Sequence, residues 1–316
     1  MKVSVCIPTH RRPALLARCL DAVLAQEPGR HEIEVVVVDD GSPASDGVAE
    51  VVAAAAGGAA LPVRYERLAT NRGAAAARNT AWRLASGEWI AFTDDDCRPR
   101  PDWLRRLLAS VDDVDIIQGC TVPDPAGQHL VGRPLVRTLD VPAPDGFFQT
   151  CNIAYRRAVL EQLDGFDVTF ARSGEDTDLA WRARAAGART AFRADAVVEH
   201  AVVELSWRQD LRARRRWSDM PALLGRHPGL GDRTWWGPVY RRSHALPLAV
   251  VAATPLLASR RGRRAVAATL AAVLAGDIVA AGSPVAARAA LATRLGDAVE
   301  TAVLAGASIR AGTVLL

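Results

Sequence analysis

The sequence predicts an α/β fold in which helices cover a mostly parallel sheet, followed by an α-helical C-terminal region. Strand-like and helix-like segments alternate through the first half of the chain, as in parallel sheets with crossover helices. Residues 33–38 are rich in β-branched side chains and fit a central strand buried on both faces. After about residue 205 the composition becomes rich in Arg and Trp, then in Ala, Leu and Val. We therefore expect two parts, residues 1–205 and 206–316.

Each element follows from a local pattern. An apolar run of alternating or continuous type predicts a strand, and a longer run with helical spacing predicts a helix. The segment from 121 to 146 is rich in Pro and Gly and has no such period, so we expect a long functional loop there. Strands are expected at 3–7, 33–38, 63–68, 88–93, 114–118, 147–155 and 189–200, and helices at 13–26, 46–56, 73–85, 101–110 and 176–186.

The bulk composition bounds the class of protein. Half of the residues are hydrophobic, which excludes global disorder. The net charge of +4 comes with arginine clusters at 208–216 and 260–264, each beside apolar sequence. This placement suits an anionic membrane surface, and we expect no nucleic-acid partner. The five cysteines form no CxxC pair, and the N-terminus shows no signal-peptide pattern, so we expect reduced thiols and a cytoplasmic catalytic part.

Polar clusters follow three of the predicted strands. Pro8, Thr9 and His10 follow the first, Asp39 to Ser42 follow the second, and Asp94, Asp95 and Asp96 follow the fourth. Ligands of open parallel sheets bind beyond the carboxyl ends of the strands. Three consecutive aspartates repel one another unless a cation neutralises them, and their hard oxygen atoms suit Mg²⁺ or Mn²⁺ holding a diphosphate. By the two-residue period of a strand, we expect Asp94 and Asp96 to share one face and Asp95 to point the other way. Capping of the next helix is the alternative.

Five motifs in order resemble family 2 glycosyltransferases, which have the GT-A fold. They are VSVCIPTHRRP, VVVVDDGS, NRGAAAARN, FTDDDC and GEDTDLAWRARAAG, and they span residue 2 to about residue 200. The resemblance implies a donor site for a nucleoside-diphosphate sugar. It assigns Thr9 and Asp39 to the nucleobase and ribose, Arg78 to the nucleotide, Asp94 to the ribose, and Asp96 and His200 to the metal. Pro8 and Asp95 are also expected to contact the nucleotide sugar.

The resemblance also implies the chemistry. Glu175 and Asp176 match the family's "ED" pair, in which the Asp is the usual base that deprotonates an acceptor hydroxyl. A single displacement from the opposite face then inverts the anomeric configuration. The acceptor is a glycan, a lipid-linked sugar or a small molecule, and the sequence leaves its identity, the sugar and the oligomeric state open.

Several of these residues have a structural alternative. Asp39 and Asp40 would also form an Asx-turn before Gly41, and Arg78 would also fit a solvated helix face. Glu175, Asp176 and Asp178 stand at a helix start, where the dipole favours acids; for Asp178 we adopt that explanation. His200 would also fit the surface at a strand end.

Two other functions compete with glycosyl transfer. A nucleotidyltransferase that forms sugar nucleotides has a related domain, but it opens with a Gly-rich loop, and IPTHRRP contains no glycine. An inactive nucleotide-binding scaffold would not need the acidic triplet together with Glu175 and Asp176.

The C-terminal region departs from the processive members of the family. Those enzymes carry a Q/R-x-x-R-W motif, whereas this chain has Ala213 at the first position before Arg216 and Trp217, so we expect non-processive transfer. Residues 245–259 and 265–276 are uncharged but shorter than the ~20 residues of a membrane span. If both crossed, the arginines at 260–264 would lie outside, against the positive-inside rule. We expect interfacial association at the inner face of the membrane, with a soluble helical domain or a dimerisation domain as the alternative.

Overall fold

The computed structural model describes residues 1–27, 29, 31–233, 239–313 and 315. By contacts, the chain divides into two compact units. The first consists of residues 1–131 and 138–202, and the second of residues 132–137 and 203–316. Residues 132–137, which are part of the loop predicted at 121–146, therefore belong to the second unit. The predicted functional boundary at residue 205 stays a prediction.

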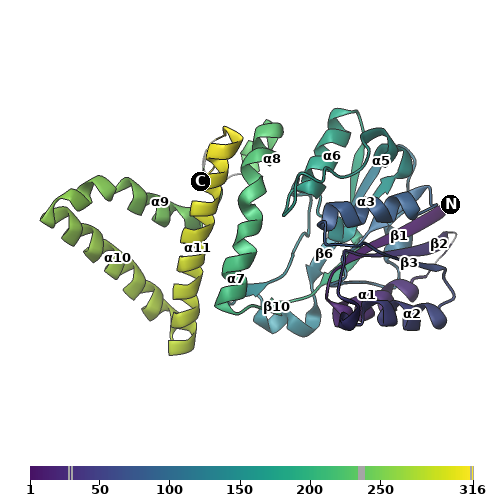
Figure 1. Ribbon diagram of the computed structural model, residues 1–316, viewed down its shortest axis with the longest axis horizontal. Coiled ribbons are helices and arrows are strands. Elements are labelled where there is room, and N and C mark those ends of the chain that lie inside the picture. The colour runs from purple at the N-terminus through teal and green to yellow at the C-terminus, as the bar shows by residue number, and fades with distance from the viewer. Residues whose placement is uncertain (28, 30, 234–238, 314, 316) are drawn as a thin grey trace. The chain divides into compact units, whose positions relative to one another are not determined.

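The first unit is built on an eight-stranded, mostly parallel sheet (Figure 1). Its order is β3-β2-β1-β4-β8-β6-β9-β5. The run β3-β2-β1-β4 is parallel, β8 runs antiparallel to both neighbours, and β5 runs antiparallel to β9. The predicted α/β fold is confirmed. The strands are β1 Lys2–Thr9, β2 Glu32–Asp39, β3 Val63–Arg67, β4 Trp89–Phe92, β5 Cys97–Pro99, β6 Ile116–Pro123, β8 Ile153–Arg156 and β9 Thr190–His200.

Helices cover both faces of this sheet, as Figure 1 shows for α1 and α2 on one side and α3, α5 and α6 on the other. Each face has its own apolar core, because successive side chains of a buried strand alternate between the faces. Val5 and Val35 pack with α1, α2 and α4, whereas Cys6 and Val36 pack with α3, α5 and α6. The helices are α1 Pro13–Leu24, α2 Val48–Gly57, α3 Ala74–Leu84, α4 Trp103–Leu107, α5 Arg157–Leu163 and α6 Glu175–Ala185, with short 3-10 turns at η1 Ala44–Asp46, η2 Pro125–Leu130 and η3 Thr150–Asn152.

Two local expectations are wrong. The strand expected at 147–155 begins only at Ile153, because η3 turns the chain first. The loop expected from residue 121 starts later, because β6 continues to Pro123 and pairs there with His200 of β9. Proline tolerates this position at the end of a strand.

The second unit is helical. It contains the strand pair β7 Val136–Arg137 and β10 Val203–Glu204. Inside it, the buried Arg214 of α7 donates to Asp210, and to Asp297 and Glu300 of α11. Among the described residues, no helix combines the length and the apolar character required to cross a bilayer. The helices are α7 Trp207–Arg214, α8 Met220–Arg226, α9 Ala245–Ala252, α10 Arg260–Ala281 and α11 Pro284–Ala311, with 3-10 turns at η4 Arg215–Asp219, η5 Pro228–Arg233, η6 Arg242–His244 and η7 Thr254–Ala258.

Candidate active site

The candidate site lies at the carboxyl edge of the parallel strands. Thr9 at the end of β1 is in register with Asp39 at the end of β2, and β4 ends beside them at Phe92. The acidic triplet follows immediately. The sheet topology therefore brings the motif residues of three strands to one edge, as expected for parallel strands.

Asp39 is held by its own loop. Its Oδ1 accepts from the Ser42 backbone N at 2.9 Å and from Ser42 Oγ at 2.5 Å, and its Oδ2 accepts from the Tyr65 hydroxyl at 3.0 Å. Burial and the Asp39 carboxylate raise the pKa of Tyr65 to about 12, so the hydroxyl stays a donor. This turn is the structural alternative anticipated for Asp39, and it fixes the carboxylate at the site edge. Ser42 belongs to the polar cluster that the sequence predicted after the second strand, whereas Tyr65 was not singled out.

Asp40 connects the loop that follows β2 with the loop that precedes α3. Its two carboxylate oxygens accept from the backbone N of Arg72 and of Gly73, at 2.7 and 2.8 Å. These bonds fix the segment that leads into α3, the helix carrying Arg78. Gly41, which follows the two acids, has a φ of +73°, and a Cβ there would lie 2.5 Å from the Thr70 backbone carbonyl carbon. Only glycine fits this crossing of the two loops.

Arginines neutralise the acidic triplet. Because β4 ends at Phe92, the triplet does not continue the strand, so the strand period does not set the directions of its side chains. Asp95 is nevertheless buried, whereas Asp94 and Asp96 are partly exposed. Arg12 contacts Asp95 Oδ1 at 2.5 Å and Asp96 Oδ2 at 2.7 Å, while Arg78 contacts Asp94 Oδ1 at 2.7 Å. The sequence argument that only a bound cation relieves the repulsion missed Arg12. Its signal was present, since Arg12 lies in the IPTHRRP motif.

Thr9 and Pro8 support the triplet from β1. Thr9 Oγ1 donates to Asp95 Oδ2 at 2.7 Å, and both residues are buried. Pro8 is in register with Val38 of β2, one residue before the end of β1. Burial raises the pKa of Asp95 to about 7, against the opposing effect of Arg12. Asp95 is therefore anchored inside, while Asp94 and Asp96 keep side-chain exposures of 24% and 16%.

Arg78 connects the triplet to the start of α6. Its Nη1 donates to Glu175 Oε1 at 2.7 Å and its Nη2 to Asp94 at the same distance, and only 5% of the residue is exposed. Burial opposes the charge, but Asp94 and Glu175 together raise the pKa of Arg78, so it stays a cation. Burial would raise the pKa of Asp94, but Arg78 and Arg12 lower it overall. The alternative of a solvated helix residue is wrong for Arg78, because the side chain is buried and doubly paired.

Asp176 differs from its neighbour Glu175. Glu175 is held by Arg78, whereas within the described part of the chain Asp176 forms no ion pair, and its Oδ1 accepts from the Thr177 backbone N at 2.8 Å. Burial and the Glu175 carboxylate raise the pKa of Asp176 to about 7. Asp178 is fully buried and paired with Arg182 at 2.7 Å, which supports its structural explanation. Asp176 thus has the proton affinity of a general base working near neutral pH.

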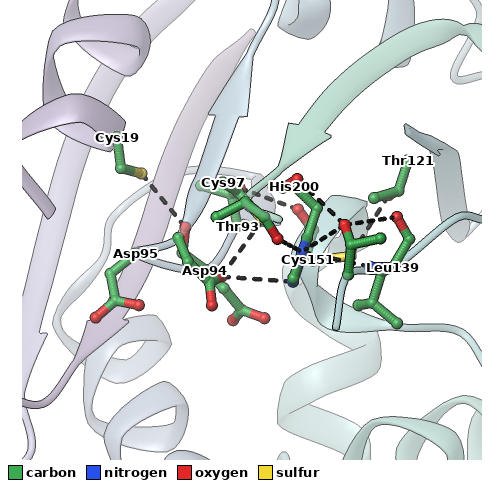
Figure 2. A network of polar contacts seen from close by, with 12 residues as sticks. Cys19, Thr93, Asp94, Asp95, Cys97, Thr121, Leu139, Cys151 and His200 are labelled. Atoms are coloured by element: carbon green, nitrogen blue, oxygen red, sulfur yellow. Dashed lines mark hydrogen bonds and ion pairs between the residues drawn. The ribbon is translucent and has the colours of Figure 1, made fainter. Parts of the chain in front are cut away.

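Asp96 and His200 lie together at the exposed side of the triplet. His200 Nε2 is 3.7 Å from Asp96 Oδ1, because β5 and β9 pair Cys97 with His200. His200 Nδ1 lies 2.9 Å from Ala201 O and 3.3 Å from Thr138 Oγ1. This contact orients the ring so that Nε2 faces the carboxylate, as in many metal-binding histidines. Figure 2 shows Asp94, Asp95 and His200 gathered at this edge.

A divalent cation fits this pair of ligands. An oxygen and an imidazole nitrogen suit Mn²⁺, and Mg²⁺ would rely mainly on the oxygen. The nearby Cys97 is buried, and burial raises the pKa of its thiol well above the usual range. A neutral thiol is a poor metal ligand. The residues that could hold a metal are therefore Asp96 and His200.

Comparisons with known proteins agree with this architecture. The model of the family "Glycosyl transferase family 2" matches residues 4–164, and that of "Glycosyl transferase family group 2" matches residues 89–276. A pre-mycofactocin glycosyltransferase of Mycobacterium tuberculosis is 30% identical over 211 residues, which are 63% of this chain and 42% of that protein. Glycosyltransferase AglE of Haloferax volcanii is 29% identical over 63% of this chain and 66% of its own length. The chain thus spans less than half of the first of these relatives.

A solved structure extends the likeness to the fold. The mannosyltransferase PcManGT from Pyrobaculum calidifontis, solved with GDP-Man and Mn²⁺, has a TM-score of 0.65 and 24% identity. The match covers 98% of this chain and 86% of that one. The fold is therefore of the GT-A type. Since the family model covers half of the sequence, the chain belongs to glycosyl transferase family 2.

Proposed function

We propose that the chain transfers a sugar from a nucleoside-diphosphate sugar to a hydroxyl acceptor, with inversion of the anomeric configuration and with help from Mg²⁺ or Mn²⁺. This proposal rests on the different surroundings of the two neighbouring acids, Glu175 and Asp176, at the start of α6. Arg78 holds Glu175, and Asp176 keeps an unpaired carboxylate with a pKa of about 7. A single proton-accepting carboxylate, that of Asp176, near the acidic triplet supports a single displacement without a covalent intermediate.

The donor would lie along the carboxyl edge of the sheet. Asp39, fixed by Ser42 and Tyr65, faces the nucleoside end in this proposal, and Asp94 faces the ribose. Arg12 and Arg78 supply positive charge beside the place of the diphosphate. A divalent cation held by Asp96 and His200 would neutralise the charge that develops on the departing diphosphate.

Asp176 would take the proton from the acceptor hydroxyl during the attack. Glu175 would contribute indirectly, because its carboxylate orients Arg78 and raises the pKa of Asp176. The acceptor class remains that of a glycan, a lipid-linked sugar or a small molecule. Transfer of one or a few sugars is proposed because Ala213 stands where the motif of the processive enzymes has Gln or Arg. We also propose a peripheral position at the inner face of the membrane, based on the apolar and Arg-rich sequence of residues 206–316.

Substitutions at the two acids test the proposed base. Asp176→Asn keeps the size of the side chain and removes its proton-accepting charge. We expect normal affinity for nucleoside diphosphate by titration calorimetry and a loss of transfer by about 10²–10⁴. Glu175→Gln frees Arg78 and should weaken donor binding as well. Asp39→Asn should weaken nucleotide binding more than the chemical step.

Asp112→Asn, the same change at an exposed position, is the matched control. If Glu175→Gln abolishes transfer while Asp176→Asn transfers normally, the base is Glu175. Normal transfer by both variants would reject the proposed mechanism.

A further inference from the structure

Two apolar helices of the second unit bury none of their described residues. α9 carries no charged side chain, and α10 has a single one after Arg264, namely Asp277. Asp277 is paired with Arg294 of α11 at 2.8 and 2.9 Å. Val251, Leu256 and Val279 are exposed by 62%, 54% and 80%. Extended apolar surfaces of this kind mark a contact with a partner or a membrane.

The two helices form one structural piece. Figure 1 shows α9 and α10 meeting at an angle, with η7 between them and α10 returning to α11. We call residues 245–281 the α9–α10 hairpin. It encloses a cavity of about 180 Å³, lined by apolar side chains that include Leu246, Val250, Leu256, Val266 and Leu270. Its inner and outer surfaces are therefore both apolar.

Apart from Asp277, which is paired with Arg294, all charged side chains of the hairpin are arginines. Four arginines, Arg260, Arg261, Arg263 and Arg264, stand exposed in the first turns of α10, and residues 239–276 contain no Asp or Glu. Ser259 caps this helix by accepting from Gly262 N at 2.9 Å. Cations at a helix N-terminus oppose the helix dipole, so these arginines do not serve the stability of α10. They suit an external anionic surface.

We propose that the α9–α10 hairpin lies in the interfacial layer of an anionic phospholipid bilayer. Its apolar side chains enter the acyl region, and the four arginines contact phosphate headgroups. A second copy of the chain is disfavoured, because a symmetric contact through this surface would bring two groups of exposed like charges, among them Arg260, Arg261 and Arg264, close to each other. The inference deepens the peripheral membrane position proposed above by naming the segment and the lipid class.

Sedimentation with vesicles tests the hairpin on the full chain, without any sugar donor. We expect binding to phosphatidylcholine vesicles that contain phosphatidylglycerol and little binding to phosphatidylcholine alone. Arg260→Gln with Arg261→Gln should weaken binding roughly fivefold for each arginine, or about 30-fold for the pair. The matched control removes the same charge from exposed positions of α7, with Arg208→Gln and Arg212→Gln, and should bind nearly as the parent does.

A second pair of variants tests insertion rather than charge. Val251→Asp with Val279→Asp changes exposed positions, so the fold should persist by circular dichroism. We expect loss of the vesicle binding that survives high salt. If the α7 control loses binding while the α10 variant keeps it, the chain is peripheral but the hairpin is not its contact. Equal binding to both vesicle types, or a dimer that the Asp variants dissociate, would overturn the inference. Because no donor is present, none of these results depends on glycosyl transfer.

Discussion

At the scale of single residues, the site is organised by arginines that pair with the acids named by the motifs. Arg12 neutralises Asp95 and Asp96, and Arg78 joins Asp94 to Glu175. Burial and the Glu175 carboxylate raise the pKa of Asp176, against the opposing effect of Arg78. Within the described part of the chain, the proposed base differs from Glu175 and the acidic triplet in forming no ion pair.

The rate of transfer should depend on pH through Asp176. Its pKa is raised to about 7, and the base works only when it is deprotonated. We expect kcat to fall about tenfold per pH unit below that value and to level off above it. Glu175→Gln removes the charge that raises this pKa, so the acid limb should move to lower pH. A pH profile of kcat on donor-saturated enzyme measures both. A limb that stays in place in Glu175→Gln would contradict the assignment.

The sequence motifs identified the acids but not their pairing. Thr9, Asp39 and the triplet are contiguous signals at strand ends, and parallel topology alone places them at one edge. The partners come from distant segments, as Tyr65 does for Asp39 and Arg12 does for Asp96. The sequence also could not predict where β4 ends, because three consecutive aspartates do not reveal whether the strand continues through them.

At the scale of elements, an irregularity between β6 and β9 aims His200 at the triplet. The register shifts between Gly119, paired with Arg193, and Cys120, paired with Val197. The buried Asn152 fills the gap, since its amide donates to Cys120 O at 2.8 Å and to Ala196 O at 2.9 Å. Its Oδ1 accepts from Trp103 Nε1 at 2.8 Å. Such bulges redirect a strand near a functional site. No local sequence pattern predicted this one.

Asn152→Ala should destabilise the first unit. The change leaves two buried carbonyls and the Trp103 N–H without these partners, and each unsatisfied group costs about 1–3 kcal/mol. We expect a loss of about 3–5 kcal/mol in the free energy of unfolding, measured by denaturant titration. Gln128→Ala, at an exposed position, should change it by less than about 0.5 kcal/mol. A neutral Asn152→Ala would show that the irregular pairing is held by other contacts.

At the scale of the whole molecule, the candidate active site and the proposed membrane contact belong to different compact units. The first has the GT-A fold and the candidate site, and the composition change near residue 205 predicted that something else follows. The helical content of the second unit followed from its sequence, but its buried Arg214 cluster did not. Residues 132–137 could not be assigned to it either, because they join it through segments distant in sequence, by the β7–β10 pair and by the ion pair of Arg137 with Asp210.

The most direct test of the central claim is the release of nucleoside diphosphate from a panel of nucleotide sugars by the full chain. We predict that at least one donor is turned over with Mn²⁺ or Mg²⁺, that chelation with EDTA stops the release, and that adding the metal restores it. Asp96→Ala should remain inactive under all of these conditions, because Asp96 lies within 3.7 Å of His200 at the proposed metal site. Full activity of Asp96→Ala in the presence of chelator would contradict the metal-assisted mechanism, and a panel without any turnover would contradict glycosyl transfer itself.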